Sequence, residues 1–177
     1  KLNITGIEIQ GSAVTIAKKN VANNKKAIKI FDGDFLDNKL IFSKKQFDLI
    51  ISNPPYRKIK SGRLNQNKSK AVARHELKLN LQNMLRKAKS LLKKGGHIAL
   101  TYPPTRLQET LRELEDQKLF PNRIRFIHGK KKSNAKIFLI EARKGQKSDL
   151  IVDSPLYVYN NDGSYTKEMQ DIYDSFN

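Results

Sequence analysis

The sequence predicts an α/β fold, in which a doubly wound, mostly parallel sheet closes with an antiparallel strand pair. Three observations predict it. Strand-like and helix-like apolar patterns alternate along most of the 177 residues. Residues 47–52 are apolar almost throughout, which is typical of a parallel strand covered on both faces. Residues 123–128 and 135–142 form two apolar runs separated by a short polar turn, which predicts the antiparallel pair.

The elements follow in order along the chain. Residues 3–9 form the first expected strand, and residues 11–23 carry apolar side chains at helical spacing. Residues 27–31 form the second strand and lead into the turn Asp-Gly-Asp-Phe at 32–35. The strand at 47–52 comes next.

A long helix then carries an apolar stripe from Leu77 to Leu92. We expect it to end at Gly95-Gly96, because glycine is a frequent C-terminal signal of helices. A strand at 97–102 and a helix with leucines at 107–114 precede the antiparallel pair.

Basic residues outnumber acidic ones by 35 to 17. We divide the chain into a core, residues 1–148, and an acidic tail, residues 149–177, expected to pack on the core through Tyr157, Tyr159 and Tyr165. The tail holds six acids and one lysine, which leaves 34 basic and 11 acidic residues in the core, a net charge of +23. Such a charge favours a polyanion, such as nucleic acid, over a small neutral substrate.

Other classes of protein are disfavoured. The chain has no cysteine, hence no disulfide framework and no thiolate metal site, and its three histidines lack metal-ligand spacing. No apolar stretch approaches the roughly 20 residues of a membrane helix. We therefore expect a cytoplasmic protein that uses neither a membrane nor a metal. The oligomeric state stays open.

The strand at 47–52 runs into Asn53, Pro54, Pro55 and Tyr56, at the sheet edge where ligands bind in this fold class. The exocyclic amine of adenine is a poor nucleophile, because its lone pair is delocalised into the ring. Two acceptors on its N–H groups would localise that lone pair. Asn53 can supply a side-chain carbonyl and Pro54 a backbone carbonyl, and the prolines fix both beforehand. Tyr56 offers a face on which a base can stack.

Two acidic positions follow other strands. Glu8 ends the first strand, where a carboxylate can accept both hydroxyls of a ribose, although a solvated acid explains it equally well. Asp34, with Phe35 after it, follows the second strand. It can accept from an adenine amino group while the ring packs on the base, or it is simply a turn aspartate.

Two basic segments are candidates for binding RNA. Residues 57–74 contain seven cations and no acid, and we expect them to lie along an RNA strand. These cations are Arg57, Lys58, Lys60, Arg63, Lys68, Lys70 and Arg74. The turn between the last two strands carries Lys130, Lys131 and Lys132, which either bind RNA or form a charged hairpin tip.

The ordered motifs Gly-Ile-Glu-Ile at 6–9, Asp-Gly-Asp-Phe at 32–35 and Asp-Leu-Ile-Ile-Ser-Asn-Pro-Pro-Tyr at 48–56 resemble the class I S-adenosylmethionine-dependent methyltransferases that methylate amines. The resemblance implies a Rossmann-like fold with S-adenosylmethionine as cofactor. It assigns Asn53, Pro54, Pro55 and Tyr56 to the target amine, with Asn53 also beside the cofactor. It further assigns Glu8 and Ile9 to the ribose of the cofactor, and Asp34 and Phe35 to its adenine.

Residues 71–76, 93–104 and 154–173 are similar to the bacterial tRNA adenine-N6-methyltransferases, which act beside the anticodon of a valine tRNA. This implies N6-methylation of an adenine in tRNA. The family's first strand and Gly-rich cofactor loop have no counterpart after Lys1, so we expect them upstream of it. We expect residues 1–177 alone to bind cofactor weakly and to be inactive.

Three other functions stay open. The same motif can serve a glutamine amide of a protein, although a protein acceptor gives less reason for the positive charge. Adenine in DNA is a further acceptor that charge does not exclude. A chain without a cofactor loop can also be a non-catalytic RNA-binding module. The favoured prediction is methylation of RNA.

Overall fold

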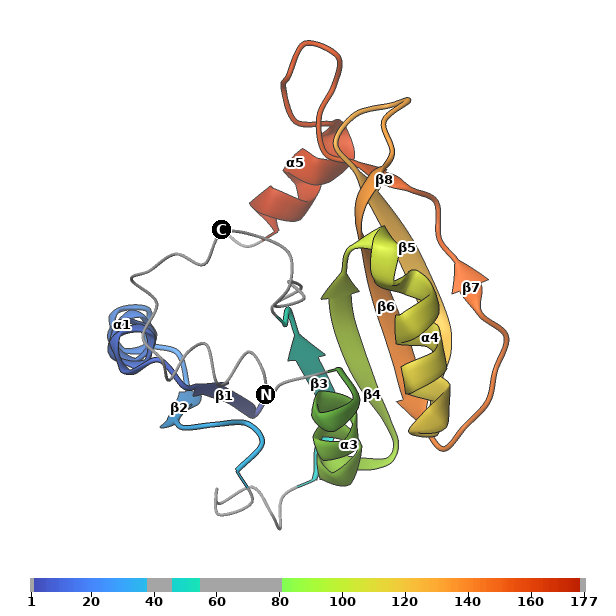
Figure 1. Ribbon diagram of the computed structural model, residues 1–177. Helices are drawn as coiled ribbons and strands as arrows, with labels where there is room; N and C mark the ends of the chain where they lie inside the picture. Colours follow the sequence, from blue (N-terminus) through green and yellow to red (C-terminus); the bar gives the residue numbers. More distant parts are fainter. Residues whose placement is uncertain (1, 38–45, 55–80, 176–177) are drawn as a thin grey trace, which may run out of the picture. The chain divides into compact units, whose positions relative to one another are not determined.

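The computed structural model describes residues 2–37, 46–54 and 81–175. The chain divides into two compact units, residues 1–45 and residues 46–177, and each unit is described by itself (Figure 1).

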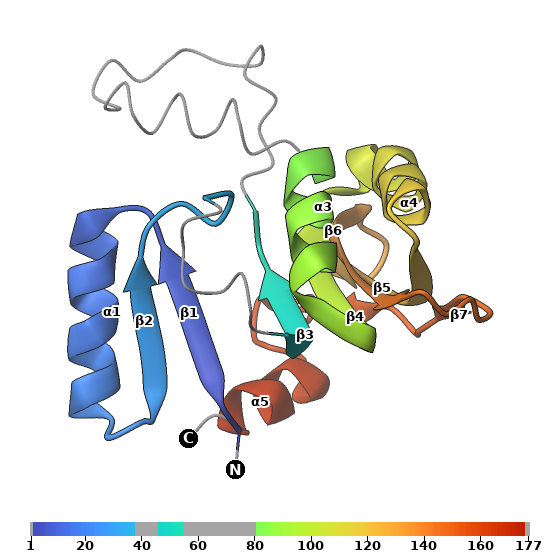
Figure 2. The ribbon, with the colours of Figure 1, turned by 90° about the horizontal axis from the view of Figure 1, so that it is seen from below.

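The first unit is a strand–helix–strand arrangement. Its elements are β1 (Ile4–Glu8), α1 (Gly11–Asn23) and β2 (Ile28–Asp32). The two strands are parallel, with Ile4 opposite Ile28 and Glu8 opposite Asp32. The helix α1 packs along this pair through its buried Val14 (Figure 2). Because the strands are parallel, their carboxyl ends lie at the same edge.

The second unit contains a six-stranded mixed sheet. Its strands are β3 (Phe47–Ser52), β4 (Leu92–Tyr102), β5 (Leu119–His128), β6 (Ala135–Lys144), β7 (Ile151–Val152) and β8 (Leu156–Tyr157). They are ordered β3-β4-β6-β5-β7, and β8 also pairs with β5. The strand β3 is parallel to β4, whereas β6 is antiparallel to both β4 and β5. The predicted α/β fold and its closing antiparallel pair are confirmed.

Two helices cover one face of this sheet. They are α3 (Leu81–Leu91) and α4 (Leu107–Asp116), with the short 3₁₀ helix η2 (Pro104–Arg106) just before α4. Figures 1 and 2 show α3 and α4 on the same side of the sheet, and they contact each other. The core lies between them and alternate residues of the strands, such as Ile98, Leu100 and Phe138. In the described ranges, no helix has the length and apolar character that a membrane span requires.

The predicted end of the long helix is wrong. The helix ends at Leu91, and β4 begins at Leu92. The register against β3 then jumps, because Phe47 pairs with Leu92 but Leu49 pairs with His97. Gly95 has a φ of +73°, in the left-handed region that favours glycine. The glycine pair therefore forms an irregularity inside a strand instead of a helix terminus.

The strand β5 begins four residues before the predicted position. It includes Pro121, which lacks the N–H of a regular strand residue. The register with β6 shifts between Pro121 and Arg123, and such irregularities are where sheets tolerate proline.

The C-terminal segment lies along the outer side of β5. Ile151 and Val152 pair with Arg123 and Ile124, and the next pairing joins Ile127 to Leu156. The helix α5 (Lys167–Asp174) follows, with Thr166 as its N-cap. The division of the chain into a core and a tail at residue 148 stays a prediction.

Candidate functional site

Two of the predicted carboxylates lie at the same edge of the first unit. Glu8 ends β1, and the N–H of Gly33 donates to its backbone carbonyl oxygen at 2.9 Å. This hydrogen bond holds the turn after β2, and with it Asp34, against the end of β1. The sequence placed Glu8 and Asp34 at two strand ends, and the parallel pairing brings those ends together.

The turns orient both carboxylates. Oε1 of Glu8 accepts the N–H of Gln10 at 2.8 Å, and Oδ1 of Asp34 accepts the N–H of Leu36 at 2.8 Å. Both side chains are half-buried. An apolar residue follows each acid in the sequence. Ile9 follows Glu8 and is exposed, and Phe35 follows Asp34 and is half-buried. Carboxylates accept hydrogen bonds, and the ribose hydroxyls and adenine amino group of S-adenosylmethionine donate them, so this set of residues fits that cofactor.

The predicted amine site begins in the second unit. Asn53 directly follows β3 and is exposed, and Pro54, the next residue in the chain, is buried. Ser52 pairs with Leu100, so the parallel strands β3 and β4 end at one edge of the sheet. The buried ring of Pro54 fixes the backbone that presents Asn53. Pro55 and Tyr56 lie outside the described residues.

Arg106 contacts Tyr102 at the end of β4, the strand that pairs with β3 beside Asn53. The guanidinium of Arg106 lies 5.0 Å from the ring centroid of Tyr102, which is only 2% exposed. Arg106 also donates to both carboxylate oxygens of Glu109, from Nε at 3.0 Å and from a terminal nitrogen at 2.6 Å. The hydrogen bonds to Glu109 raise the pKa of Arg106 above its usual value. The sequence predicts a helix with leucines at 107–114 but not this contact, although a basic residue three positions before an acid is a visible signal of the Arg106–Glu109 pair.

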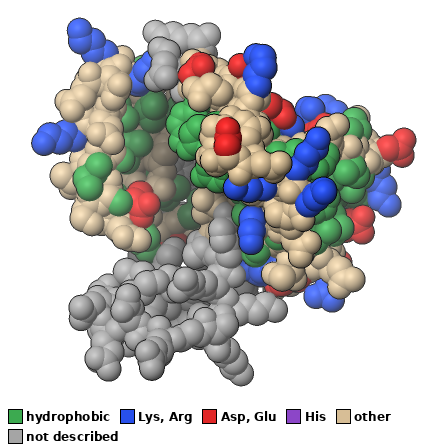
Figure 3. All heavy atoms as spheres, turned by 90° about the horizontal axis from the view of Figure 1, so that it is seen from above, with side chains coloured by type: hydrophobic (Ala, Val, Ile, Leu, Met, Phe, Trp, Pro, Cys, Tyr) green, Lys and Arg blue, Asp and Glu red, His purple; other side chains and the backbone are tan. Residues whose placement is uncertain are grey.

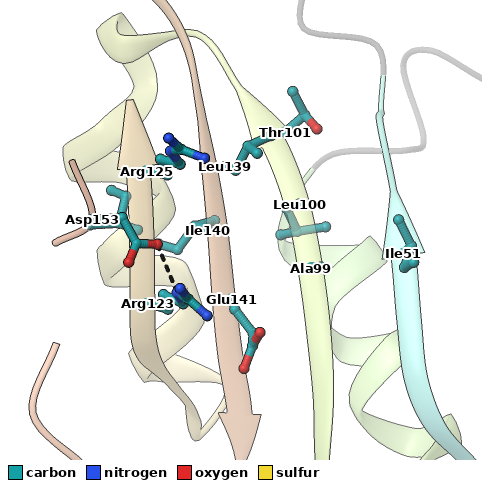
Figure 4. Close-up of a pocket in the computed structure, with 11 residues that line it drawn as sticks. Ile51, Ala99, Leu100, Thr101, Arg123, Arg125, Leu139, Ile140, Glu141 and Asp153 are labelled. Atoms are coloured by element: carbon teal, nitrogen blue, oxygen red, sulfur yellow. Dashed lines mark hydrogen bonds and ion pairs between the residues drawn. The ribbon is translucent and has the colours of Figure 1, made fainter. Parts of the chain in front are cut away.

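A hollow of about 410 Å³ lies on the sheet face opposite α3 and α4 (Figure 4). Its lining includes the apolar side chains of Ile51, Ala99 and Leu139, and an ion pair between Arg123 and Asp153 at 2.7 Å. This hollow lies along the strands and does not include Asn53 among its lining residues. Sequence reasoning did not predict it, because it depends on the order of strands from distant parts of the chain.

A polar cluster adjoins the hollow. Glu141 accepts from Asn122 at 2.9 Å and lies 2.7 Å from Nδ1 of His97. The hydrogen bond from Asn122, followed by the contact with His97, lowers the pKa of Glu141. In the described part of the chain, no group of three or more His, Cys, Asp or Glu residues could hold a metal ion.

The predicted RNA-binding cations divide into two groups. Seven of them, Arg57, Lys58, Lys60, Arg63, Lys68, Lys70 and Arg74, lie outside the described residues. The turn between β5 and β6 is described, and its lysines Lys130, Lys131 and Lys132 are exposed. In Figure 3, other lysine and arginine side chains are scattered over the visible face among acidic and hydrophobic ones.

The model of one protein family, the methyltransferase small domain, matches residues 1–117. The tRNA1(Val) (adenine(37)-N6)-methyltransferase of Porphyromonas gingivalis is 36% identical over 110 residues, which cover 60% of this chain and 42% of that protein. The chain thus spans less than half the length of this relative. The protein of the same name from Shewanella woodyi is 27% identical over 175 residues, covering 94% of this chain and 71% of that protein.

Solved structures show the same fold. A predicted O-methyltransferase from Agrobacterium tumefaciens has a TM-score of 0.74 at 17% identity, covering 97% of this chain and 77% of that one. TrmN from Thermus thermophilus has a TM-score of 0.54 at 18% identity, covering 80% of this chain and 36% of that one. At these identities the likeness concerns the fold alone, and it confirms the predicted Rossmann-like α/β class.

Proposed function

This chain belongs to the methyltransferase small domain family, and on that premise we propose that the complete protein methylates N6 of an adenine in tRNA. The observation that carries the proposal is Asn53, exposed at the carboxyl end of a parallel strand and anchored by the buried Pro54. An amide acceptor held at this edge is what activation of an exocyclic amine needs.

We assign the cofactor to the carboxylates of the first unit. Glu8 would accept from the ribose hydroxyls of S-adenosylmethionine, and Asp34 would accept from its adenine amino group, with Ile9 and Phe35 as apolar neighbours. Hydrogen bonds within the turns already orient both carboxylates, so cofactor binding costs little further side-chain entropy, which supports this assignment. When bound, the cofactor supplies an electrophilic methyl group.

Asn53 and Pro54 perform the other part of the chemistry. In this proposal, Oδ1 of Asn53 and the carbonyl oxygen of Pro54 each accept one N–H of the adenine amine. Those two bonds localise the lone pair of the nitrogen and aim it away from the ring. They also strengthen as positive charge develops on the nitrogen, so they stabilise the transition state more than the ground state. The methylated amine then loses its extra proton to solvent.

Charge and relatedness both favour tRNA as the acceptor. Residues 1–148 carry a net charge of +23, which attracts a polyanion far more than it attracts a neutral protein side chain. The curated relatives from Porphyromonas gingivalis and Shewanella woodyi are both named for adenine 37 of tRNA1(Val). We propose an adenine of the anticodon loop for this chain as well, and hence a cytoplasmic location.

Identification of the methylated product tests this function. The complete protein is incubated with methyl-labelled S-adenosylmethionine and an unmodified tRNA pool, and the RNA is digested to nucleosides. We expect label in N6-methyladenosine. Label in a glutamine of added protein, or in DNA adenine alone, would refute the proposal that tRNA is the methyl acceptor. Cofactor binding without any transfer would point to a non-catalytic RNA-binding module.

A further inference from the structure

Three tyrosines of the C-terminal segment stack on one another at the surface. The ring centroids of Tyr159 and Tyr165 lie 5.4 Å apart with 15° between the planes, and those of Tyr165 and Tyr173 lie 5.3 Å apart with 27°. The three residues, here called the tyrosine ladder, are 41%, 39% and 49% exposed in chain order. Aromatic rings usually bury their area, so a stack left at the surface is available to a further planar group.

The ladder is built on a fixed backbone. An antiparallel bridge joins Tyr159 to Tyr165, and the side-chain amide of Asn160 donates to the carbonyl oxygen of Tyr165 at 2.9 Å. Tyr173 comes from α5, whose N-cap Thr166 donates to the carbonyl oxygen of Tyr157 at 2.6 Å. The interaction with the hydroxyl of Tyr173, its neighbour in the ladder, raises the pKa of Tyr165. A ligand would find the rings already ordered.

One end of the ladder adjoins the lysine turn, residues 130–132. The N–H of Tyr159 donates to the carbonyl oxygen of Gly129 at 2.9 Å, directly before the lysines. Nζ of Lys130 donates to the carbonyl oxygen of Asn161 at 3.0 Å, inside the hairpin that carries the ladder. Lys131 and Lys132 are exposed, and neither forms an ion pair within the described ranges.

The acids near the ladder already have partners. Glu168 pairs with Arg125, Asp171 pairs with Lys167, and Asp162 and Asp174 accept from Ser164 and Gln170. The partners of Asp162 and Asp174 are neutral, so these two acids keep their charge, but the lysine turn still brings three exposed cations to the Tyr159 end of the ladder. An aromatic face next to exposed cations is the combination with which proteins bind single-stranded nucleic acid.

We propose that the tyrosine ladder and the lysine turn bind a single-stranded segment of the tRNA substrate. One base stacks on Tyr159, and the neighbouring phosphates contact Lys131 and Lys132. This proposal rests on the proposed function, because it concerns the same RNA. It adds a second contact on a different segment from Asn53, so it governs how tightly tRNA is held and leaves the transfer step unchanged.

The test uses three variants of the complete protein and unmodified tRNA over a salt series. Tyr159→Ala should weaken tRNA binding by roughly 5- to 150-fold, since it removes one stacking ring. Tyr159→Phe is the matched control and should stay within about twofold, because it keeps the ring. The double variant Lys131→Ser, Lys132→Ser should flatten the slope of log affinity against log salt by about 1.4, or about 0.7 for each phosphate that is no longer neutralised. Single-turnover transfer at saturating tRNA should match the parent in all three.

The outcomes separate this proposal from the proposed function. A parent protein that transfers no methyl group to tRNA refutes the function. If the parent methylates tRNA but Tyr159→Ala binds as tightly as Tyr159→Phe, the ladder does not stack on RNA. The double lysine variant keeps the ladder intact. If its salt slope equals that of the parent, Lys131 and Lys132 do not contact phosphates. Equal losses for Tyr159→Ala and Tyr159→Phe would likewise contradict stacking.

Discussion

Replacing Gly96 with alanine should push β3 away from β4. Gly96 is buried where the register between these strands shifts. A Cβ at this position would lie 3.1 Å from the carbonyl oxygens of both Lys93 and Phe47, and 3.2 Å from that of Asp48. All three neighbours are backbone atoms, which cannot turn aside as a flexible side chain can. The strand β3 must therefore move, and Asn53 follows that strand.

The size of the effect follows from these close approaches. Overpacking in a tightly packed interior costs about 1–3 kcal/mol. Gly129→Ala is the matched control, because its Cβ would meet only Oγ of Ser133, at an ordinary 3.9 Å, and Gly129 has no left-handed φ. It should change stability by less than about 0.5 kcal/mol. The difference between the two variants isolates the clash at Gly96 from the general effect of removing a glycine.

Urea unfolding and amide hydrogen exchange measure this difference. Gly96→Ala should lower the free energy of unfolding by about 1–3 kcal/mol. The amides of β3 should exchange roughly 5- to 150-fold faster, and so should amides of β5 and β6 that exchange only through global unfolding. Methyl transfer should also fall, because small displacements of a positioned group are costly. Equal stability and equal protection of β3 in Gly96→Ala and Gly129→Ala would contradict the close approach of Gly96 to the backbone of β3.

Two further predictions concern stability. The pKa of Glu141 is lowered from its ordinary 4.5 by Asn122 and His97, so its ionised form stabilises the fold above that pH, and this contribution disappears as the pH falls through the folded pKa. Glu141→Gln should therefore flatten the acid limb of urea-unfolding stability between about pH 6 and pH 3, and an unchanged limb would refute the contact. Thr166→Ala removes the acceptor for the N–H of Met169 and should cost about 0.5–2 kcal/mol in the same assay, with Thr166→Ser close to the parent. Equal losses in the two Thr166 variants would exclude the cap as the cause.

Most helices and strands could be predicted from the sequence, because the spacing of apolar residues within each segment indicates its type. The apolar run at 47–52 coincides with β3, and the helical spacing at 11–23 coincides with α1. The boundary at Leu91 and Leu92 was missed because two leucines suit the end of a helix and the start of a strand equally. The glycines at 95 and 96 then looked like a helix terminus, and only the pairing with β3 reveals their position inside β4.

The candidate site shows the same limit. Asn53 and Pro54 could be proposed from sequence because the motif is contiguous and its chemistry is specific. The contact of Arg106 with Tyr102 depends on how a strand meets a helix. The tyrosine ladder depends on the pairing of Tyr159 with Gly129, thirty positions earlier in the chain. Tyr159 and Tyr165 were expected to anchor the tail by packing, yet they stack on each other and stay exposed.

The central claim is that Asn53 activates the adenine amine, and single-turnover transfer by Asn53→Ala in the complete protein tests it most directly. Losing one preorganised group of this kind typically lowers the rate on the order of 100- to 1000-fold. S-adenosylmethionine affinity, measured in parallel, should stay within a few-fold, because Glu8 and Asp34 are unchanged. A slow transfer with intact cofactor binding is the predicted result. Near-parental transfer by Asn53→Ala would contradict the mechanism.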